Sequence, residues 1–259
     1  ESLAEWLTNS DAVASMIGWA VAQPPADMAD APALISETET VSRAELRQMM
    51  LRAAAMILHL QDGLPTDGDP TLGGAAKAQQ HRIMVILPKG SALLAVTMGA
   101  VAGGSLLCVC QDDLSPDVIN ARVTAFAPDL IISTAGAWSA ALEVHPALVD
   151  APVLLCGDEG NMAALEDLLE SFAPASHLPR FDADRPALVV FTSGSDGSPK
   201  GTVLRAGIVA FGTGMDAMAT LGSDDRVAYL TRWDAVGLVD QLACLRGGAA
   251  LCLPDEARV

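Results

Sequence analysis

From residue 82 onward, the chain alternates between two kinds of hydrophobic pattern. Short continuous apolar runs predict buried strands, and longer stretches with apolar residues three or four positions apart predict helices. The predicted strands are residues 82–87, 105–110, 129–133, 152–156, 225–230 and 249–253. The predicted helices are residues 91–103, 115–126 (capped by Ser115), 137–148, 161–172, 207–221 and 235–245. This alternation indicates an α/β fold with mostly parallel β-sheets covered by helices.

The N-terminal part of the chain has fewer strands. The elements predicted there are a helix over residues 2–23, a β pair over 33–36 and 38–41, a helix over 43–60 and a loop over 61–80. Ser42 and Glu45 have the capping-box spacing that starts a helix. We therefore expect a single domain over residues 1–259, with a helical lead-in at 1–32 and an α/β body at 33–259.

The composition indicates a large folded core. Of the 259 residues, 51% are hydrophobic and 18% are charged, which excludes a disordered chain. The net charge of −17 would repel nucleic acids and anionic membrane surfaces. Residues 91–110 are long enough to span a membrane, but Gly103 and Gly104 divide them into a helix and a strand. The first residue is Glu1 with no signal region after it, so we interpret the chain as a piece of a longer protein.

The five cysteines are Cys108, Cys110, Cys156, Cys244 and Cys252. They lie in apolar runs or at the end of one, and none belongs to a CxxC pair or stands at metal-ligand spacing from a histidine. This pattern is typical of buried free thiols in the reducing cytoplasm, and it predicts no disulfide and no metal site.

Residues 192–201 interrupt the hydrophobic pattern with small polar residues. They stand between an apolar β run at 189–191 and a second β run, so the pattern predicts strand, loop and strand. The glycines permit close backbone approach, and the hydroxyls together with the charge of Lys200 could hold a phosphate group. Arg205 is the other basic residue near this loop. A solvated surface turn is the alternative, whereas a Walker-type loop is excluded because GxxxxGK[ST] is absent.

The residues FTSGSDGSPKG, from Phe191 to Gly201, resemble the signature [YF]-T-S-G-[ST]-T-G-x-P-K-G of adenylate-forming (AMP-binding) enzymes. This superfamily contains acyl-CoA synthetases and the adenylation domains of nonribosomal peptide synthetases. The resemblance implies the fold of their N-terminal subdomain and a ligase activity, ATP-dependent acyl or aminoacyl adenylation. It implies that ATP, with Mg²⁺, is bound through its phosphates by Thr192, Ser193, Gly194, Ser195, Gly197 and Lys200.

A second segment of the chain, starting at Trp233 and Asp234, resembles the family's F-D-x-S-V-W-E region. The resemblance implies that these two residues lie near the acyl or aminoacyl pocket. In amino-acid-activating members, the Asp of this region holds the α-amino group of the substrate. A helix N-cap is the alternative role of Asp234.

Three residues depart from the family's signatures. Asp196 stands where the phosphate signature has Thr, Ala102 where a second signature has Lys, and Ala206 where a His usually follows. The family's adenine segment, ribose-binding Asp and C-terminal subdomain with its catalytic Lys would all follow the part that this chain resembles. We therefore expect no catalytic residue in the chain. We interpret it as a truncated adenylation-like domain, unable to adenylate by itself, that acts as a structural or docking element of a larger synthetase.

Two other hypotheses remain open. The chain could be the N-terminal part of an active enzyme that adenylates carboxylates or amino acids and is completed by missing sequence or by another chain. It could also be an unrelated α/β binding module. The expected partners are neighbouring domains of a synthetase, a carrier protein among them, and a second copy of the chain, because a partial fold exposes apolar surface.

Overall fold

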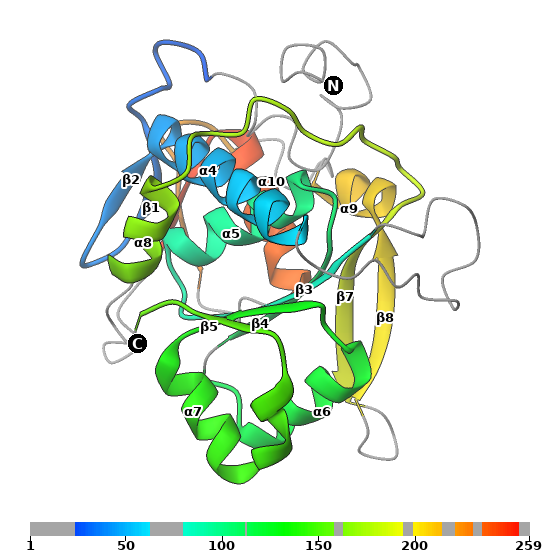
Figure 1. Cartoon of the computed structure of the whole chain (residues 1–259). Coiled ribbons are helices and arrows are strands. Elements are labelled where there is room, and N and C mark those ends of the chain that lie inside the picture. Colours follow the sequence, from blue (N-terminus) through cyan, green and yellow to red (C-terminus); the bar gives the residue numbers. More distant parts are fainter. Residues whose placement is uncertain are drawn as a thin grey trace.

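The computed structural model describes residues 24–62, 80–111, 113–157, 163–193, 199–213, 221–229 and 235–253. These residues form two β-sheets, and helices pack on both faces of the larger sheet (Figure 1). The predicted α/β class with mostly parallel strands is therefore confirmed. The helix predicted over residues 2–23 lies outside the described residues.

The larger sheet contains six strands in the order β6-β5-β3-β4-β7-β8. They are β3 (Arg82–Leu87), β4 (Leu106–Gln111), β5 (Leu130–Ser133), β6 (Val153–Leu155), β7 (Pro186–Ser193) and β8 (Pro199–Arg205). Neighbouring strands are parallel except β7 and β8, which form an antiparallel hairpin. The carboxyl ends of the parallel strands meet at one edge of the sheet, and α/β proteins bind their ligands at such an edge.

The smaller sheet joins the two ends of the described chain. Its four strands have the order β2-β1-β10-β9. They are β1 (Pro32–Ile35), β2 (Thr40–Ser42), β9 (Arg226–Ala228) and β10 (Ala250–Cys252). Leu34 of β1 lies opposite Leu251 of β10 in a parallel pair. The β pair predicted near the N-terminus is therefore confirmed, and its partner is the last described strand.

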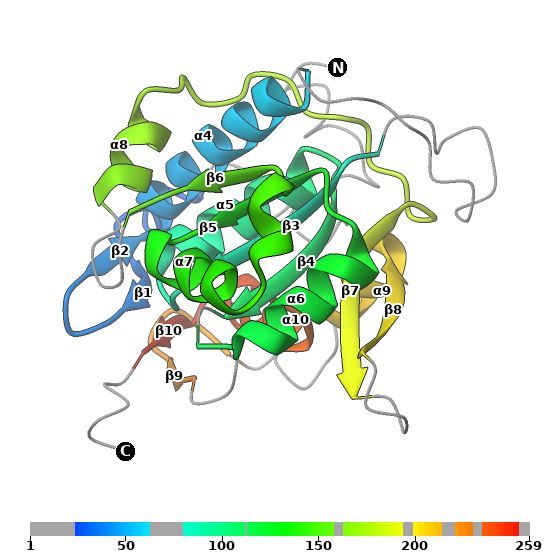
Figure 2. The same cartoon turned by 60° about the horizontal axis from the view of Figure 1, so that its bottom comes forward.

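Two hydrophobic cores lie on opposite faces of the six-stranded sheet. Figures 1 and 2 show α6 and α7 on one face, and α4, α5 and α10 on the other. The helices are α4 (Arg43–Gln61), α5 (Ser91–Ala102), α6 (Pro116–Phe126), α7 (Ala135–Val144), α8 (Ala163–Glu170), α9 (Ala206–Thr213) and α10 (Ala235–Gly247). This arrangement explains why the sheet strands read as nearly continuous apolar runs, since both of their faces are covered.

One predicted helix boundary, at the end of α7, was wrong. The helix predicted over residues 137–148 ends as α7 at Val144, and a 3₁₀-helix, η3 (Pro146–Asp150), follows it. Pro146 explains this break, because proline disfavours helical backbone in the preceding residue and donates no backbone hydrogen bond. Ser115 is the N-cap residue of α6, as predicted, although its side chain makes no capping hydrogen bond.

The contact between α4 and α5 depends on small side chains. All residues of α5 are buried, as expected for a helix that is apolar on every side. A Cβ atom at Gly99 would lie 2.8 Å from both the Cβ of Ala53 and the backbone nitrogen of Ala54. The two helix backbones can therefore approach this closely only because residue 99 is glycine.

Two devices hold the start of α4 in place. The hydroxyl of Ser42 accepts a hydrogen bond from the backbone nitrogen of Glu45, and the Glu45 carboxylate accepts one from the backbone nitrogen of Ser42 at 2.8 Å. This confirms the predicted capping box. The Arg43 guanidinium donates to the carbonyl oxygens of Leu245 and Ala249, each at 2.9 Å, and to that of Gly248. These bonds link α4 to the C-terminal end of α10.

Candidate functional site

The two strands predicted on either side of residues 192–201 are confirmed as β7 and β8, which form one hairpin. The predicted loop was too long, because β7 continues to Ser193 and β8 begins at Pro199, and residues 194–198 lie outside the described residues. At the end of the hairpin where its two strands are connected, Thr192 lies opposite Lys200, and Ser193 lies opposite Pro199. The Thr192 hydroxyl donates to the carbonyl oxygen of Lys200 at 3.4 Å. Both of these residues are exposed. The sheet therefore holds Thr192, Ser193 and Lys200 at the base of one turn.

The remaining predicted phosphate-binding residues, Gly194, Ser195 and Gly197, lie outside the described residues, as does Asp196. β7 runs parallel to β4, and its last residue, Ser193, stands at the carboxyl edge of the sheet. The segment thus begins where parallel sheets position ligands.

Close packing explains why the hairpin contains a glycine at position 201. Gly201 lies opposite Phe191 in the strand register. A Cβ atom at Gly201 would lie 3.1 Å from Cγ1 of Val189 and 3.2 Å from Cε1 of Phe191. A larger residue would displace the Phe191 ring, which packs against the core beneath α6 and α7.

A buried thiol pair and an arginine lie beside this ring. The Sγ atoms of Cys108 and Cys110 are 4.0 Å apart on β4. The Arg122 guanidinium donates to Sγ of Cys110 at 3.4 Å, and its Cζ lies 5.6 Å from the centroid of the Phe191 ring. The pKa of the Cys108 thiol lies well above its ordinary value because of its hydrogen bond with Cys110 and because of burial.

Sequence reasoning missed Arg122 as a neighbour of the hairpin. A signal was present, because Arg122 follows Ile119 by three positions and precedes Phe126 by four, so it shares their inward face of α6. Arg205, by contrast, is not a candidate for this site. It lies opposite Pro186, at the far end of the hairpin from Lys200, and forms an ion pair with Asp184 at 3.0 Å.

The second predicted site, at Trp233 and Asp234, lies outside the described residues. Helix α10 begins at Ala235, directly after this pair. Both alternatives for Asp234, the substrate contact and the N-cap, stay predictions. The two other residues that depart from the family's signatures lie within the described part of the chain. Ala102 is the last residue of α5 and Ala206 is the first residue of α9, and both are buried.

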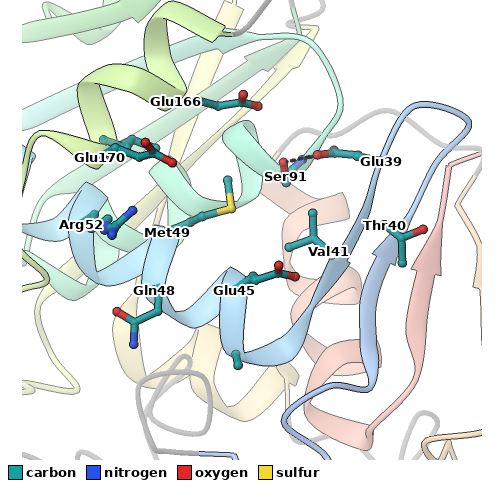
Figure 3. A pocket seen from close by; sticks show the side chains of 12 residues that line it. Glu39, Thr40, Val41, Glu45, Gln48, Met49, Arg52, Ser91, Glu166 and Glu170 are labelled. Atoms are coloured by element: carbon teal, nitrogen blue, oxygen red, sulfur yellow. Dashed lines mark hydrogen bonds between the residues drawn. The ribbon is translucent and has the colours of Figure 1, made fainter.

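A groove of about 520 Å³ lies on the other side of the molecule, between α4, α8 and the β1–β2 hairpin (Figure 3). Its charged lining residues are Glu39, Glu45, Arg52, Glu166 and Glu170. The carboxylates outnumber the guanidinium and would repel a nucleotide phosphate. Figures 1 and 2 both show α8 and the β1–β2 hairpin, which line this groove, on the opposite side of the molecule from the β7–β8 hairpin, so we exclude the groove as the phosphate site.

Glu39 has a structural role at the rim of this groove. Its carboxylate accepts hydrogen bonds from the backbone nitrogen of Ser91 at 3.0 Å and from the Ser91 hydroxyl at 2.7 Å. The hydrogen bond from the Ser91 hydroxyl, drawn as a dashed line in Figure 3, orients the Glu39 carboxylate toward Ser91. Glu39 therefore caps the N-terminus of α5 from the β1–β2 hairpin.

The described part of the chain contains no candidate metal site and no candidate membrane span. No group of three or more His, Cys, Asp or Glu side chains there is arranged to hold a metal ion. None of the helices in the same residues combines the length and the apolar character needed to cross a bilayer. Of the five free cysteines, Cys108, Cys110, Cys156 and Cys244 are buried, as predicted, and Cys252 is partly exposed.

Comparisons with known proteins identify the family. The model of the AMP-binding enzyme family matches residues 21–259. Sulfoacetate–CoA ligase of Cupriavidus necator is 30% identical over 200 residues, which are 74% of this chain and 38% of the ligase. Phenyloxazoline synthase MbtB of Mycobacterium tuberculosis is 29% identical over 240 residues, 88% of this chain and 14% of the synthase. The chain thus spans well under half the length of both relatives.

Solved structures agree on the fold. ATP-bound MatB from Rhodopseudomonas palustris superposes with a TM-score of 0.72 over 93% of this chain and 45% of that protein, at 18% identity. The N-terminal domain of FACL13 from Mycobacterium tuberculosis superposes with a TM-score of 0.71 over 92% of this chain and 57% of that domain, at 17% identity.

Proposed function

Because the chain belongs to the family of AMP-binding enzymes, we propose that it provides the phosphate-binding part of an adenylate-forming domain and does not form an acyl-adenylate by itself. One observation carries this proposal. The β7–β8 hairpin holds Thr192 and Lys200 opposite each other at the base of the turn that carries the phosphate signature. This turn begins at the carboxyl edge of the six-stranded sheet.

The residues at the hairpin fit the triphosphate of ATP. Exposed hydroxyl groups can donate to phosphate oxygens, and the Lys200 ammonium can offset part of their charge. Mg²⁺ is commonly bound through the phosphates of a substrate, so we expect this ion to enter as the counter-ion of the nucleotide. ATP supplies the activated phosphorus that a substrate carboxylate attacks, whereas the chain binds and orients the phosphates.

The acyl or aminoacyl substrate would lie near the start of α10. Trp233 and Asp234 directly precede Ala235, the first residue of this helix. A carboxylate at position 234 can pair with the α-amino group of an amino-acid substrate. With Trp233, it would define one side of the pocket.

Adenylyl transfer depends mainly on positioning and on charge stabilisation. A phosphate-binding turn alone supplies little of either. The adenine, ribose and catalytic-lysine segments implied by the family resemblance would have to complete the site from other residues or from another chain. We therefore propose that catalysis requires such a complement.

A non-catalytic docking role is the second candidate. Asp196 favours it, because a carboxylate within the phosphate signature would repel the nucleotide. Ala102 and Ala206 replace polar signature residues and are buried. In this role, the chain would be a cytoplasmic structural element that packs against neighbouring synthetase domains, a carrier protein, or a second copy of itself.

Calorimetric titration of the chain with ATP and MgCl₂ tests the proposal. We expect saturable binding that Lys200→Met weakens about tenfold, because one charge close to the phosphates is removed. Arg180→Met is the matched control, since Arg180 is an exposed arginine that lies outside the hairpin, 20 positions before Lys200 in the sequence. Absence of binding would favour the docking role. Pyrophosphate exchange by the isolated chain would contradict the proposed need for a complement.

A further inference from the structure

We propose that the groove between α4, α8 and the β1–β2 hairpin docks a basic segment of a partner protein, in which lysine or arginine side chains flank an apolar residue. We call it the acidic groove after its charged lining residues, Glu39, Glu45, Arg52, Glu166 and Glu170. The acidic groove shares no lining residue with the β7–β8 hairpin. This inference therefore goes beyond the proposed function and does not depend on it.

The floor of the acidic groove is apolar. Val41 and Leu169 line it and are buried, with exposed fractions of 8% and 2%. Figure 3 shows the side chain of Met49 in the centre of the groove, among the labelled acidic side chains. The volume of about 520 Å³ lies within the range of pockets that enclose a bound ligand, about 300–1,000 Å³. The floor can therefore bury an aliphatic side chain, which a small hydrophilic cation does not supply.

Helix α8 contributes two carboxylates to the rim of the groove. Glu166 and Glu170 are exposed and stand four positions apart, so they lie on the same face of the helix. Among the residues that the structure describes, neither carboxylate forms an ion pair, and Arg52 pairs with neither of them. The segment directly before α8, residues 158–162, contains two acidic residues and no basic residue. The rim on this side therefore carries negative charge that a basic partner can complement.

The same two carboxylates are unfavourable for α8 itself. Like charges four positions apart on a helix repel each other. Glu170 is the last residue of α8, where the helix dipole is negative, and the last turn contains no basic residue. A positive charge bound between Glu166 and Glu170 would relieve both effects. The helix therefore favours a cationic occupant of the groove independently of the shape of the groove.

The opposite rim of the groove is already formed. Glu39 accepts hydrogen bonds from Ser91, and Glu45 accepts one from the backbone nitrogen of Ser42, so the positions of both carboxylates are fixed. A second copy of the chain would be repelled at this groove, because the net charge of each copy is −17. A basic segment of a different protein avoids this repulsion. Its apolar residue would contact the floor, and its lysine or arginine side chains would reach the carboxylates of α8.

Fluorescence anisotropy with a labelled synthetic peptide that contains only lysine and leucine tests this inference. Glu166→Gln/Glu170→Gln should weaken binding about fivefold at low ionic strength, because exposed ion pairs are individually weak, and this difference should shrink as salt is added. Glu143→Gln/Asp150→Asn is the matched control. It removes the same charge from exposed positions in α7 and η3, and it should bind like the unsubstituted chain.

A second pair of measurements tests the apolar floor. Met49→Ser should weaken binding of the lysine–leucine peptide about threefold, because less apolar surface is buried, and should leave the binding of labelled oligolysine unchanged. If oligolysine binds as tightly as the lysine–leucine peptide and Met49→Ser weakens neither, charge alone explains the binding and the inference is overturned.

Two other outcomes would overturn the inference. One is the absence of saturable peptide binding to the unsubstituted chain. The other is an equal loss of affinity in Glu166→Gln/Glu170→Gln and in Glu143→Gln/Asp150→Asn, because the peptide would then bind the acidic surface as a whole. Thermal unfolding shows whether each variant is folded, and Glu166→Gln/Glu170→Gln should be no less stable than the unsubstituted chain, since it removes the repulsion within α8.

Discussion

Replacement of Arg43 by methionine should destabilise the whole domain, because this side chain joins two ends of the chain. Arg43 is the first residue of α4, where a positive charge is unfavourable for the helix dipole. The carbonyl oxygens it contacts, those of Leu245, Gly248 and Ala249, lie at the negative C-terminal end of α10. The contact of Arg43 with the end of α10 therefore offsets the unfavourable position of its positive charge at the start of α4.

The expected loss follows from the three hydrogen bonds of the guanidinium. A hydrogen bond with a charged partner contributes about 1.5–3 kcal/mol when buried. The bonds of Arg43 are only partly buried, and water can solvate some of the released carbonyl groups. We therefore expect Arg43→Met, which keeps the apolar stem, to lower the free energy of unfolding by about 3–5 kcal/mol. For a chain of 259 residues, this corresponds to a decrease in Tm of roughly 6–10 °C.

Urea unfolding followed by far-UV circular dichroism measures this loss. The free energy of unfolding of Arg43→Lys should lie between the values for the unsubstituted chain and for Arg43→Met. An ammonium retains the charge but cannot reach three carbonyls with the planar geometry of arginine. Arg180→Met, at an exposed position, should change the free energy of unfolding by less than about 0.5 kcal/mol. A loss below about 1 kcal/mol in Arg43→Met would show that the link between α4 and α10 does not stabilise the fold as we infer.

Three further predictions concern packing, capping and ionisation. Gly99→Ala should destabilise the chain by about 2–4 kcal/mol in the same urea assay, because its Cβ would contact the α4 backbone, whereas Gly222→Ala, at an open position, should be nearly neutral. Glu39→Gln should lower the free energy of unfolding by about 1–2 kcal/mol, because Glu39 caps α5. If this decrease is no larger than the one caused by Glu143→Gln at an exposed position, the capping role of Glu39 is contradicted. Burial raises the pKa of the Cys156 thiol from 9.0 to about 11, so the folded chain holds this proton more tightly than the unfolded chain. The free energy of unfolding should therefore fall as the pH rises from 9 to 11, and Cys156→Ala should remove the part of this decrease that comes from Cys156. If the unsubstituted chain and Cys156→Ala showed the same pH dependence, this prediction would be refuted.

Much of this protein was determined by its sequence alone, because the relevant physics is local. Continuous apolar runs predicted the sheet strands, and the spacing of Ser42 and Glu45 predicted a capping box that the structure contains. The small polar residues of the phosphate signature interrupt the apolar pattern, and they predicted two neighbouring strands, which the structure contains as β7 and β8. Where one local signal was overlooked, at Pro146, the predicted helix boundary was wrong.

Only the tertiary structure decided which distant residues meet. It pairs β1 with β10, connects Arg43 to α10, and places Arg122 beside Phe191 while Arg205 lies at the far end of the hairpin. Hydrophobic periodicity reports which face of an element is buried but not which other element covers that face. The pairing of strands and the neutralisation of charges depend on partners up to about 200 positions away, and a local pattern carries no record of them.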